Sequence, residues 1–215
     1  MRRLQVLLVA VLLLALGCGS TRGGASAVAA DRDQSAAAID RLLDLLAQRL
    51  AIMPLVAKAK WNAALPVEDV ARERGLLDGM RDRARSRGLP EAWVEAVFRA
   101  QIEAGKDVQR ALIARWNAEG APAFADAPDL RGELRPRIDA LNDAILDALG
   151  EVAPVLDRRA VQARLRERGP GRLASRDVSA EVAARALAPL ERAPPRSSSR
   201  LERHELVSKG DTRPT

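Results

Sequence analysis

The sequence has almost none of the side chains on which histidine and cysteine chemistry depends. Its 215 residues include one histidine, His204, one cysteine, Cys18, and no tyrosine. A single histidine excludes histidine-based metal sites and Ser-His-Asp triads within the chain, and a single cysteine excludes a disulfide within it. The side chains that remain for a functional site are mainly cations, carboxylates and amides.

Aromatic residues are also scarce, with three Trp and two Phe, and the positive charge is unevenly placed. The net charge is +6, but Arg2 and Arg3 lie at the amino terminus, and residues 192–215 carry six basic and three acidic side chains. The body between these ends is nearly neutral. It has neither a row of basic residues to bind a phosphate backbone nor enough aromatic residues to stack on bases, so we expect no nucleic-acid partner.

The first residues have the pattern of a secretory signal. Two arginines precede an apolar run at residues 4–16, which is too short to span a bilayer, and small residues follow. Residues 27–29 (AVA) favour cleavage after position 29, whereas residues 15–18 (ALGC) resemble a lipoprotein box with cleavage before Cys18. We expect residues 1–29 to be a signal peptide, or a lipoprotein leader, and the protein to be periplasmic or secreted. Membrane contact is expected only through a lipid on Cys18.

The rest of the chain has the apolar periodicity of helices and no alternating strand pattern. One helix is expected over residues 33–60. Pro54 should kink it or relax one turn, because proline cannot donate to the Leu50 carbonyl. Others are expected from 66–69 to 86 and from Pro90 to Gly120, with a linker at 121–128. The remaining helices are expected around 138–149, over 155–168 and over 178–190.

These elements predict an all-α fold: a single-domain bundle of about six helices over residues 30–192. After position 192 the composition changes to Pro, Ser and mixed charge without apolar period. Such a segment buries too little surface to offset its ordering entropy, so we expect residues 193–215 to form a disordered basic tail.

Polar residues interrupt the apolar faces of three of these helices. Arg49 and Lys60 are eleven residues apart, which places them within roughly 20° of each other and about 16 Å apart along one helix. The other two helices carry such residues at helical spacing. They are Asp69, Arg72 and Glu73 in one, and Gln101, Gly105 and Gln109 in the other.

Two interpretations of this constellation remain open. The groups are either structural, as buried ion pairs and amide hydrogen bonds in an exported helical lipoprotein, or they bind a ligand. Unpaired buried cations are costly, and nearby carboxylates are too few to satisfy them. A dianionic ligand between the helices would supply the missing acceptors.

The chain resembles the secreted, all-helical chorismate mutases, the gamma subclass of the AroQ family, which have the type II fold. The resemblance covers about residues 34–190 and depends on the order and spacing of several motifs. These motifs are Gln48-Arg49-Leu50, Ala59-Lys60-Trp61, residues 65–69 (LPVED) with Arg72, residues 97–104 (VFRAQIEA) with Gln109, and Leu134-Arg135-Pro136 followed by residues 138–142 (IDALN).

The resemblance implies an isomerase that converts chorismate to prephenate without cofactor or metal, in aromatic amino acid biosynthesis. Arg49 and Arg135 would bind the two substrate carboxylates, and Lys60 and Gln109 would donate to the ether oxygen. The other implied substrate-binding residues have supporting roles. Arg72 would reinforce the anion site, Asp69 would orient cations, and Glu73 would accept from the substrate hydroxyl.

Three positions depart from the subclass. Gln109 stands where relatives often have glutamate, Gly105 stands where a hydroxyl residue is common, and Leu76 stands where glutamine can occur. Because an amide donates at every physiological pH, we expect activity to be flat around neutrality. Because Gly105 and Leu76 have no polar side chain, we expect Glu73 to carry more of the recognition of the substrate hydroxyl.

Members of this subclass are commonly dimers, so the resemblance implies a homodimer. An isochorismate pyruvate-lyase on the same fold is the enzymatic alternative, because a similar cationic pocket can eliminate pyruvate from a related dianion.

Overall fold

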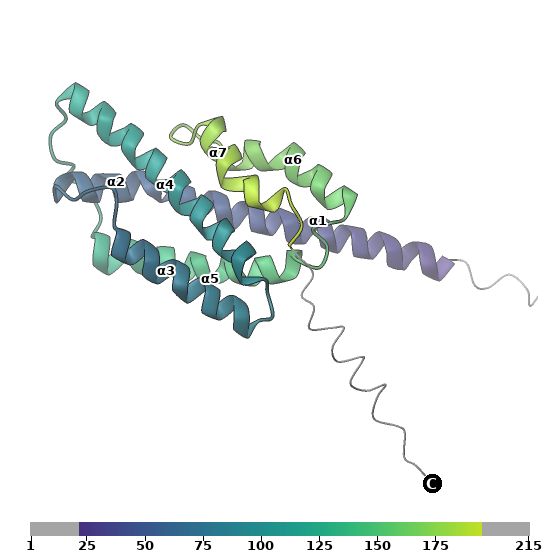
Figure 1. The fold of residues 1–215 in the computed structure, drawn as a ribbon. Helices are drawn as coiled ribbons and strands as arrows, with labels where there is room; N and C mark the ends of the chain where they lie inside the picture. Colours follow the sequence, from purple (N-terminus) through teal and green to yellow (C-terminus); the bar gives the residue numbers. More distant parts are fainter. Residues whose placement is uncertain (1–21, 195–215) are drawn as a thin grey trace, which may run out of the picture. The chain divides into compact units, whose positions relative to one another are not determined.

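The computed structural model describes residues 22–194, and within that range it contains helices and no strand (Figure 1). The predicted all-α class is confirmed. The chain divides into two units, Met1–Ala37 and Ala38–Thr215. Within the described range, the first unit consists of the beginning of helix α1 (Arg22–Ala51). The predictions about the leader up to position 21 and about the tail from position 195 fall outside the described residues.

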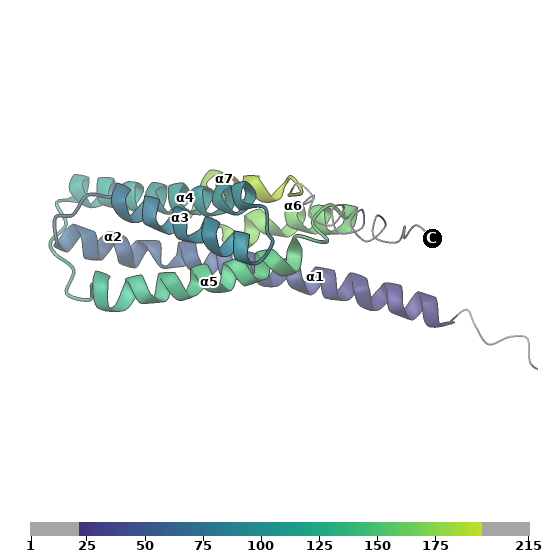
Figure 2. The ribbon, with the colours of Figure 1, turned by 60° about the horizontal axis from the view of Figure 1, so that its bottom comes forward.

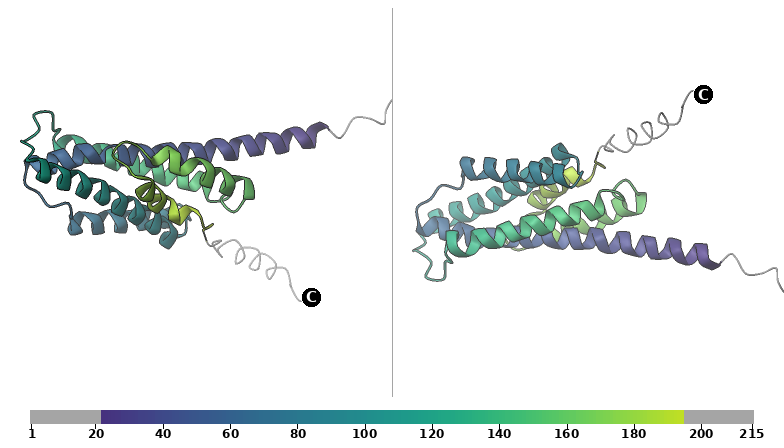
Figure 3. Two further views of the ribbon diagram at one scale, coloured as in Figure 1. Left: turned by 90° about the horizontal axis from the view of Figure 1, so that it is seen from above. Right: turned by 90° about the horizontal axis from the view of Figure 1, so that it is seen from below.

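The second unit holds the rest of α1 and all later helices. In order these are α2 (Met53–Asn62), α3 (Val70–Ser86), α4 (Glu91–Glu119), a π-helical turn (Leu130–Leu134), α5 (Arg135–Val152), α6 (Arg159–Leu173), α7 (Ala180–Leu187) and a 3-10 turn (Ala188–Leu190). Helix α4 contacts α2, α3 and α7. Figures 2 and 3 show α5 running beside the later part of α1, where Arg41 pairs with Glu151.

The first expected helix is interrupted beside Pro54, as predicted, and is divided in two. Helix α1 ends at Ala51, and α2 begins at Met53, so that Pro54 stands in the first turn of α2. Leu55 and Val56 both donate to the carbonyl of Ile52, at 3.0 and 3.1 Å. The missing N–H of proline is harmless at that position, because the first turn of a helix has no partner for it.

Helices α3 and α4 begin and end where their sequence signals predict. The side chain of Asp69 caps α3 by accepting from the backbone N–H of Arg72 at 3.2 Å. Gly120 ends α4 with a φ of 60°, which glycine adopts at little cost.

The first of the two short carboxyl-terminal helices was misplaced in the sequence analysis. Helix α6 begins at Arg159, not 155, and continues through Pro170 to Leu173, beyond the expected end at 168. Gly169 allows α6 to approach α7 closely, since a Cβ there would lie 2.8 Å from Leu187 Cδ1. Packing against α7 therefore compensates for the hydrogen bond that Pro170 cannot make.

The core of the second unit is mostly aliphatic, and every long helix contributes to it. Its largest fully buried side chains are Phe98, Ile39, Leu42, Leu43, Leu46, Leu50, Ile52, Leu134, Ile145, Leu146, Leu149 and Leu156. Among the described helices, none is both long enough and apolar enough to cross a bilayer.

Candidate active site

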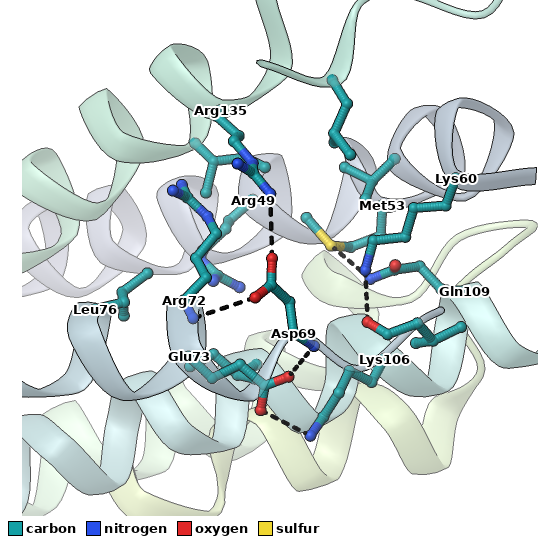
Figure 4. A pocket seen from close by; sticks show the side chains of 15 residues that line it. Arg49, Met53, Lys60, Asp69, Arg72, Glu73, Leu76, Lys106, Gln109 and Arg135 are labelled. Atoms are coloured by element: carbon teal, nitrogen blue, oxygen red, sulfur yellow. Dashed lines mark hydrogen bonds and ion pairs between the residues drawn. The ribbon is translucent and has the colours of Figure 1, made fainter. Parts of the chain in front are cut away.

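A cavity lies among α1, α2, α3, α4 and α5, and nearly all the predicted site residues line it. Besides Leu76 and further apolar side chains, the polar lining residues are Arg49, Lys60, Asp69, Arg72, Glu73, Lys106, Gln109 and Arg135. In Figure 4, Arg49, Arg72 and Arg135 lie on one side of Asp69, with Lys60, Met53 and Gln109 on the other. Five cationic side chains thus face two carboxylates, and the cavity carries an excess of positive charge.

Arg49 is the most deeply buried of these cations, with 4% of its surface exposed. Its Nε donates to Asn142 Oδ1 at 2.9 Å and its Nη1 to the carbonyl oxygen of Gln101 at 3.0 Å. Within residues 22–194 it forms no ion pair with a carboxylate. Burial, reinforced by nearby Arg72 and opposed by Asp139, lowers the pKa of Arg49 to about 10, so it remains charged at neutral pH. Its other N–H groups are available to a ligand.

Lys60 is half-buried at the opposite end of the cavity, and its Nζ donates to the carbonyl oxygen of Val67. Burial lowers the pKa of Lys60, and the nearby carboxylates of Asp69, Glu73 and Glu68 oppose that effect. No carboxylate in the described part of the chain forms an ion pair with this ammonium. Its hydrogen bond is with a neutral carbonyl, which an anionic ligand would replace favourably.

Asp69 links the beginning of α3 to α5. Its Oδ1 caps the helix, and its Oδ2 accepts from Arg135 Nη2 at 3.1 Å. A π-helical turn, of a kind often found at functional sites, directly precedes Arg135. Arg72 reaches α5 as well, through an ion pair with Asp139 at 2.9 Å. Arg135 and Arg72 are therefore both paired with carboxylates of the protein.

Gln109 lies between Gly105 and Met53. Its Nε2 donates to the Gly105 carbonyl at 3.0 Å and contacts Met53 Sδ at 3.6 Å, while its buried Oε1 has no hydrogen-bond partner in the described structure. Gly105 does not line the cavity itself. A Cβ at that position would lie 2.9 Å from Met53 Sδ, so Met53 fills the space that a side chain at 105 would need.

Sequence reasoning missed the polar role of Lys106 and the proximity of Met53 to Gln109. Lys106 stands four residues after Ile102 and three before Gln109, so its helical spacing already placed it on the pocket face of α4. Its Nζ pairs with Glu73 Oε2 at 3.0 Å. Gln101 is fully buried and outside the cavity lining, and only its main chain contacts Arg49.

The described part of the chain is an all-helical fold with a cationic pocket between its helices. The family model for chorismate mutase type II matches residues 32–110. The secreted chorismate mutase of Mycolicibacterium smegmatis is 34% identical over 115 residues, or 54% of this chain and 63% of that protein. The secreted chorismate mutase of Mycobacterium tuberculosis is 34% identical over 108 residues, or 50% of this chain and 54% of that protein.

The match to solved structures extends further along the chain. The crystal structure of chorismate mutase from Burkholderia thailandensis superposes with a TM-score of 0.63 at 31% identity, covering 71% of this chain and 98% of that one. The matched region spans less than two thirds of the length of the two curated mycobacterial relatives. This chain belongs to the chorismate mutase family.

Proposed function

We propose that this protein catalyses the [3,3]-sigmatropic rearrangement of chorismate to prephenate. The observation that carries the proposal is that Arg49 and Lys60 line one cavity without a carboxylate partner in the described part of the chain. A buried and a half-buried cation without an ion-pair partner are costly, and a dianionic substrate would supply the missing partners. Similarity to named chorismate mutases supports the choice of dianion.

The carboxylates of the substrate would bind Arg49 and Arg135. The free N–H groups of Arg49 suit one carboxylate, because the guanidinium fork presents parallel donors. Arg135 would exchange its hydrogen bond with Asp69 for the second carboxylate. Arg72 would remain with Asp139 and strengthen the positive potential around both.

Lys60 and Gln109 would act on the ether oxygen, where negative charge develops as the C–O bond breaks and the C–C bond forms. Lys60 would release the Val67 carbonyl. The second N–H of Gln109 contacts the Met53 sulfur, a weak acceptor that is easily exchanged for an oxygen. If each donor contributes about 3 kcal/mol, two give a rate effect of about 10⁴-fold, before restriction of the substrate to its reactive conformer is counted.

The test is a mutase assay on the purified protein that follows loss of the enolpyruvyl absorbance of chorismate. We expect prephenate to form, and Lys60→Ala to lower kcat/KM by about 10²- to 10³-fold without unfolding the protein. Lys58→Ala is the matched control, because Lys58 lies on the same helix but pairs with exposed Asp126 at 2.6 Å. Its activity should equal that of the wild type.

Two results would overturn this proposal. Absence of prephenate with a folded protein would favour a structural role for the buried charges. Release of pyruvate from isochorismate, offered in a parallel assay, without mutase activity would favour the lyase.

We further propose that the protein is exported, with residues 1–29 as the leader, residues 30–192 as the catalytic domain and residues 193–215 as a basic tail. The relatives that are named secreted mutases support export. Mass analysis of the processed protein distinguishes cleavage after Ala29 from lipidation of Cys18. Light scattering of the purified protein tests the expected homodimer.

A further inference from the structure

Lys106 is a pocket cation to which the proposed reaction gives no role. Its side chain is 11% exposed, and its Nζ donates to Glu73 Oε2 at 3.0 Å and pairs with Glu103 Oε1 at 2.8 Å. Burial disfavours its charge, but the hydrogen bonds with Glu103 and Glu73 outweigh that effect and raise the pKa of Lys106. It therefore stays cationic and bound to protein carboxylates across the physiological range.

The two partners of Lys106 differ in what they connect. Glu103 lies one turn away on α4 itself, with 44% of its side chain exposed, so this pair ties α4 only to itself. Glu73 lies on α3, and its second oxygen, Oε1, accepts from the backbone N–H of Asp69 at 3.2 Å. The Lys106–Glu73 pair thus connects α4 to the residue that caps α3.

Four cations from three other helices bind the α3 lead-in segment, residues 67–73. One of them, Arg110 of α4, pairs with Glu68 at the surface. Lys60 of α2 donates to the Val67 carbonyl, Arg135 of α5 donates to Asp69, and Lys106 of α4 donates to Glu73. Two of these cations, Lys60 and Arg135, are the ones that would donate to the substrate in the proposed reaction. Once they turn to the ligand, two of the four bonds remain. The bond from Lys106 is the one shielded from solvent, because the side chains of Arg110 and Glu68 are both nearly half exposed.

We propose that Lys106 is a positioning residue that fixes the α3 lead-in segment against α4 through Glu73 while Lys60 and Arg135 donate to the substrate. The inference rests on the proposed function in one respect, namely that Lys60 and Arg135 change their hydrogen-bond partners when the substrate binds. The contact between Lys106 and Glu73 does not depend on the proposed function, because the structure shows it directly. Lys106 needs no contact with the reacting atoms.

The variant that tests this is Lys106→Met, which keeps the length of the side chain and removes its charge. In the protein without substrate, we expect the backbone amides of Asp69 and Arg72 to exchange their hydrogens about ten times faster than in the wild type. In the mutase assay we expect kcat/KM to fall by about tenfold or more. Lys106→Arg should restore both quantities to within about threefold, because it keeps the charge and the donors.

Glu103→Gln is the matched control, since it removes the other carboxylate partner of Lys106 and leaves the contact with Glu73. Exchange and kcat/KM should both remain near the wild-type values. If Lys106→Met does not fold, Glu73→Gln weakens the same contact from the α3 side, because it removes the negative charge and one of the two acceptor oxygens, and it should also give faster exchange. In a folded double variant, the effects of Lys106→Met and Glu73→Gln on exchange should not add, because both act on the same interaction.

Unchanged amide exchange in Lys106→Met, or equal changes in Lys106→Met and Glu103→Gln, would overturn the inference. The two proposals fail separately. Normal mutase activity in the wild type with unaltered exchange in Lys106→Met removes the positioning role alone. Faster exchange in Lys106→Met together with an inactive wild type confirms the resting contact but removes the proposed reaction, and with it the role during substrate binding.

Discussion

Arginines cluster in two regions of the second unit, and the two clusters differ in the partners that their guanidinium groups bind. Where α6 meets α1, Arg164, Arg168 and Arg172 all approach Asp40, at 2.5, 3.8 and 4.0 Å, and each is partly exposed. In the cavity, Arg49 is almost fully buried, and its partners are an amide oxygen and a main-chain carbonyl. The first region satisfies its cations with a carboxylate of the protein, whereas the second leaves charge unsatisfied.

The difference separates structural from functional use of the same residue type. An ion pair at the surface costs little and contributes little, so it is a reasonable way to join two helices. A buried cation without a counter-charge lowers stability and is explained by a ligand that supplies the charge. Replacement of one arginine in each region should therefore give opposite results.

Arg49→Met should give the largest effect on activity of any change in this comparison. Loss of a carboxylate donor from the cavity should lower kcat/KM by about 10²- to 10³-fold. The free energy of unfolding should change by no more than about 2 kcal/mol. Removal of the desolvated charge gains about 3 kcal/mol, because burial lowers the pKa of Arg49 to about 10, and loss of the bonds to Asn142 and to the Gln101 carbonyl together costs about 2–5 kcal/mol.

Urea unfolding of Arg49→Met and steady-state kinetics measure the two quantities. A loss of 3–5 kcal/mol with little kinetic change would mean that Arg49 belongs to a structural charge network, and the contrast between the two regions would disappear.

Gln109→Glu should have the next largest effect, and it depends on pH. The amide of Gln109 donates at any pH, so wild-type kcat/KM should be flat between about pH 6 and 8. A glutamate must be protonated to donate, so the variant should lose about tenfold or more in rate on going from pH 5 to pH 8. In both proteins activity should fall at alkaline pH, as Lys60, whose pKa burial lowers from 10.5, loses its proton.

Rates measured across pH 5 to 10 on both proteins test this. An acid optimum in the wild type would show that Gln109 is not the donor that sets the profile, and it would make the cavity's chemistry depend on a carboxyl group.

The sequence predicted most of the cavity, because helical periodicity identifies which residues share a face. Arg49 and Lys60 line the same cavity even though Pro54 separates α1 from α2 between them. Periodicity does not identify the partner across the interface. The bond from Lys106 to Glu73 joins residues 33 positions apart, and the closeness of Met53 to Gly105 depends on how α2 packs on α4.

The carboxyl-terminal end of α6 was mispredicted because it too depends on packing between elements that are distant in sequence. Glycine and proline at 169–171 indicate a helix stop when considered locally. The helix continues because Gly169 and Leu173 are buried in the packing of the second unit, with Gly169 against Leu187 of α7. Interactions between elements distant in sequence decided both the site partners and this boundary.

Arg164→Met should give the smallest effect, and on stability alone. Arg164 binds Asp40 with two hydrogen bonds, Nε to Oδ1 at 2.8 Å and Nη2 to Oδ2 at 2.5 Å. The bond from Arg164 holds the pKa of Asp40 below its usual 3.8, so this stabilisation is present above about pH 4 and is lost as the pH falls through the lowered pKa. The variant should lose about 1 kcal/mol at pH 7 and less at pH 3, with kcat/KM unchanged. Urea unfolding at both pH values measures this, and Arg168→Met, whose guanidinium lies 3.8 Å from the same carboxylate, should lose less. A fall in mutase activity in Arg164→Met would show that the two arginine regions are coupled.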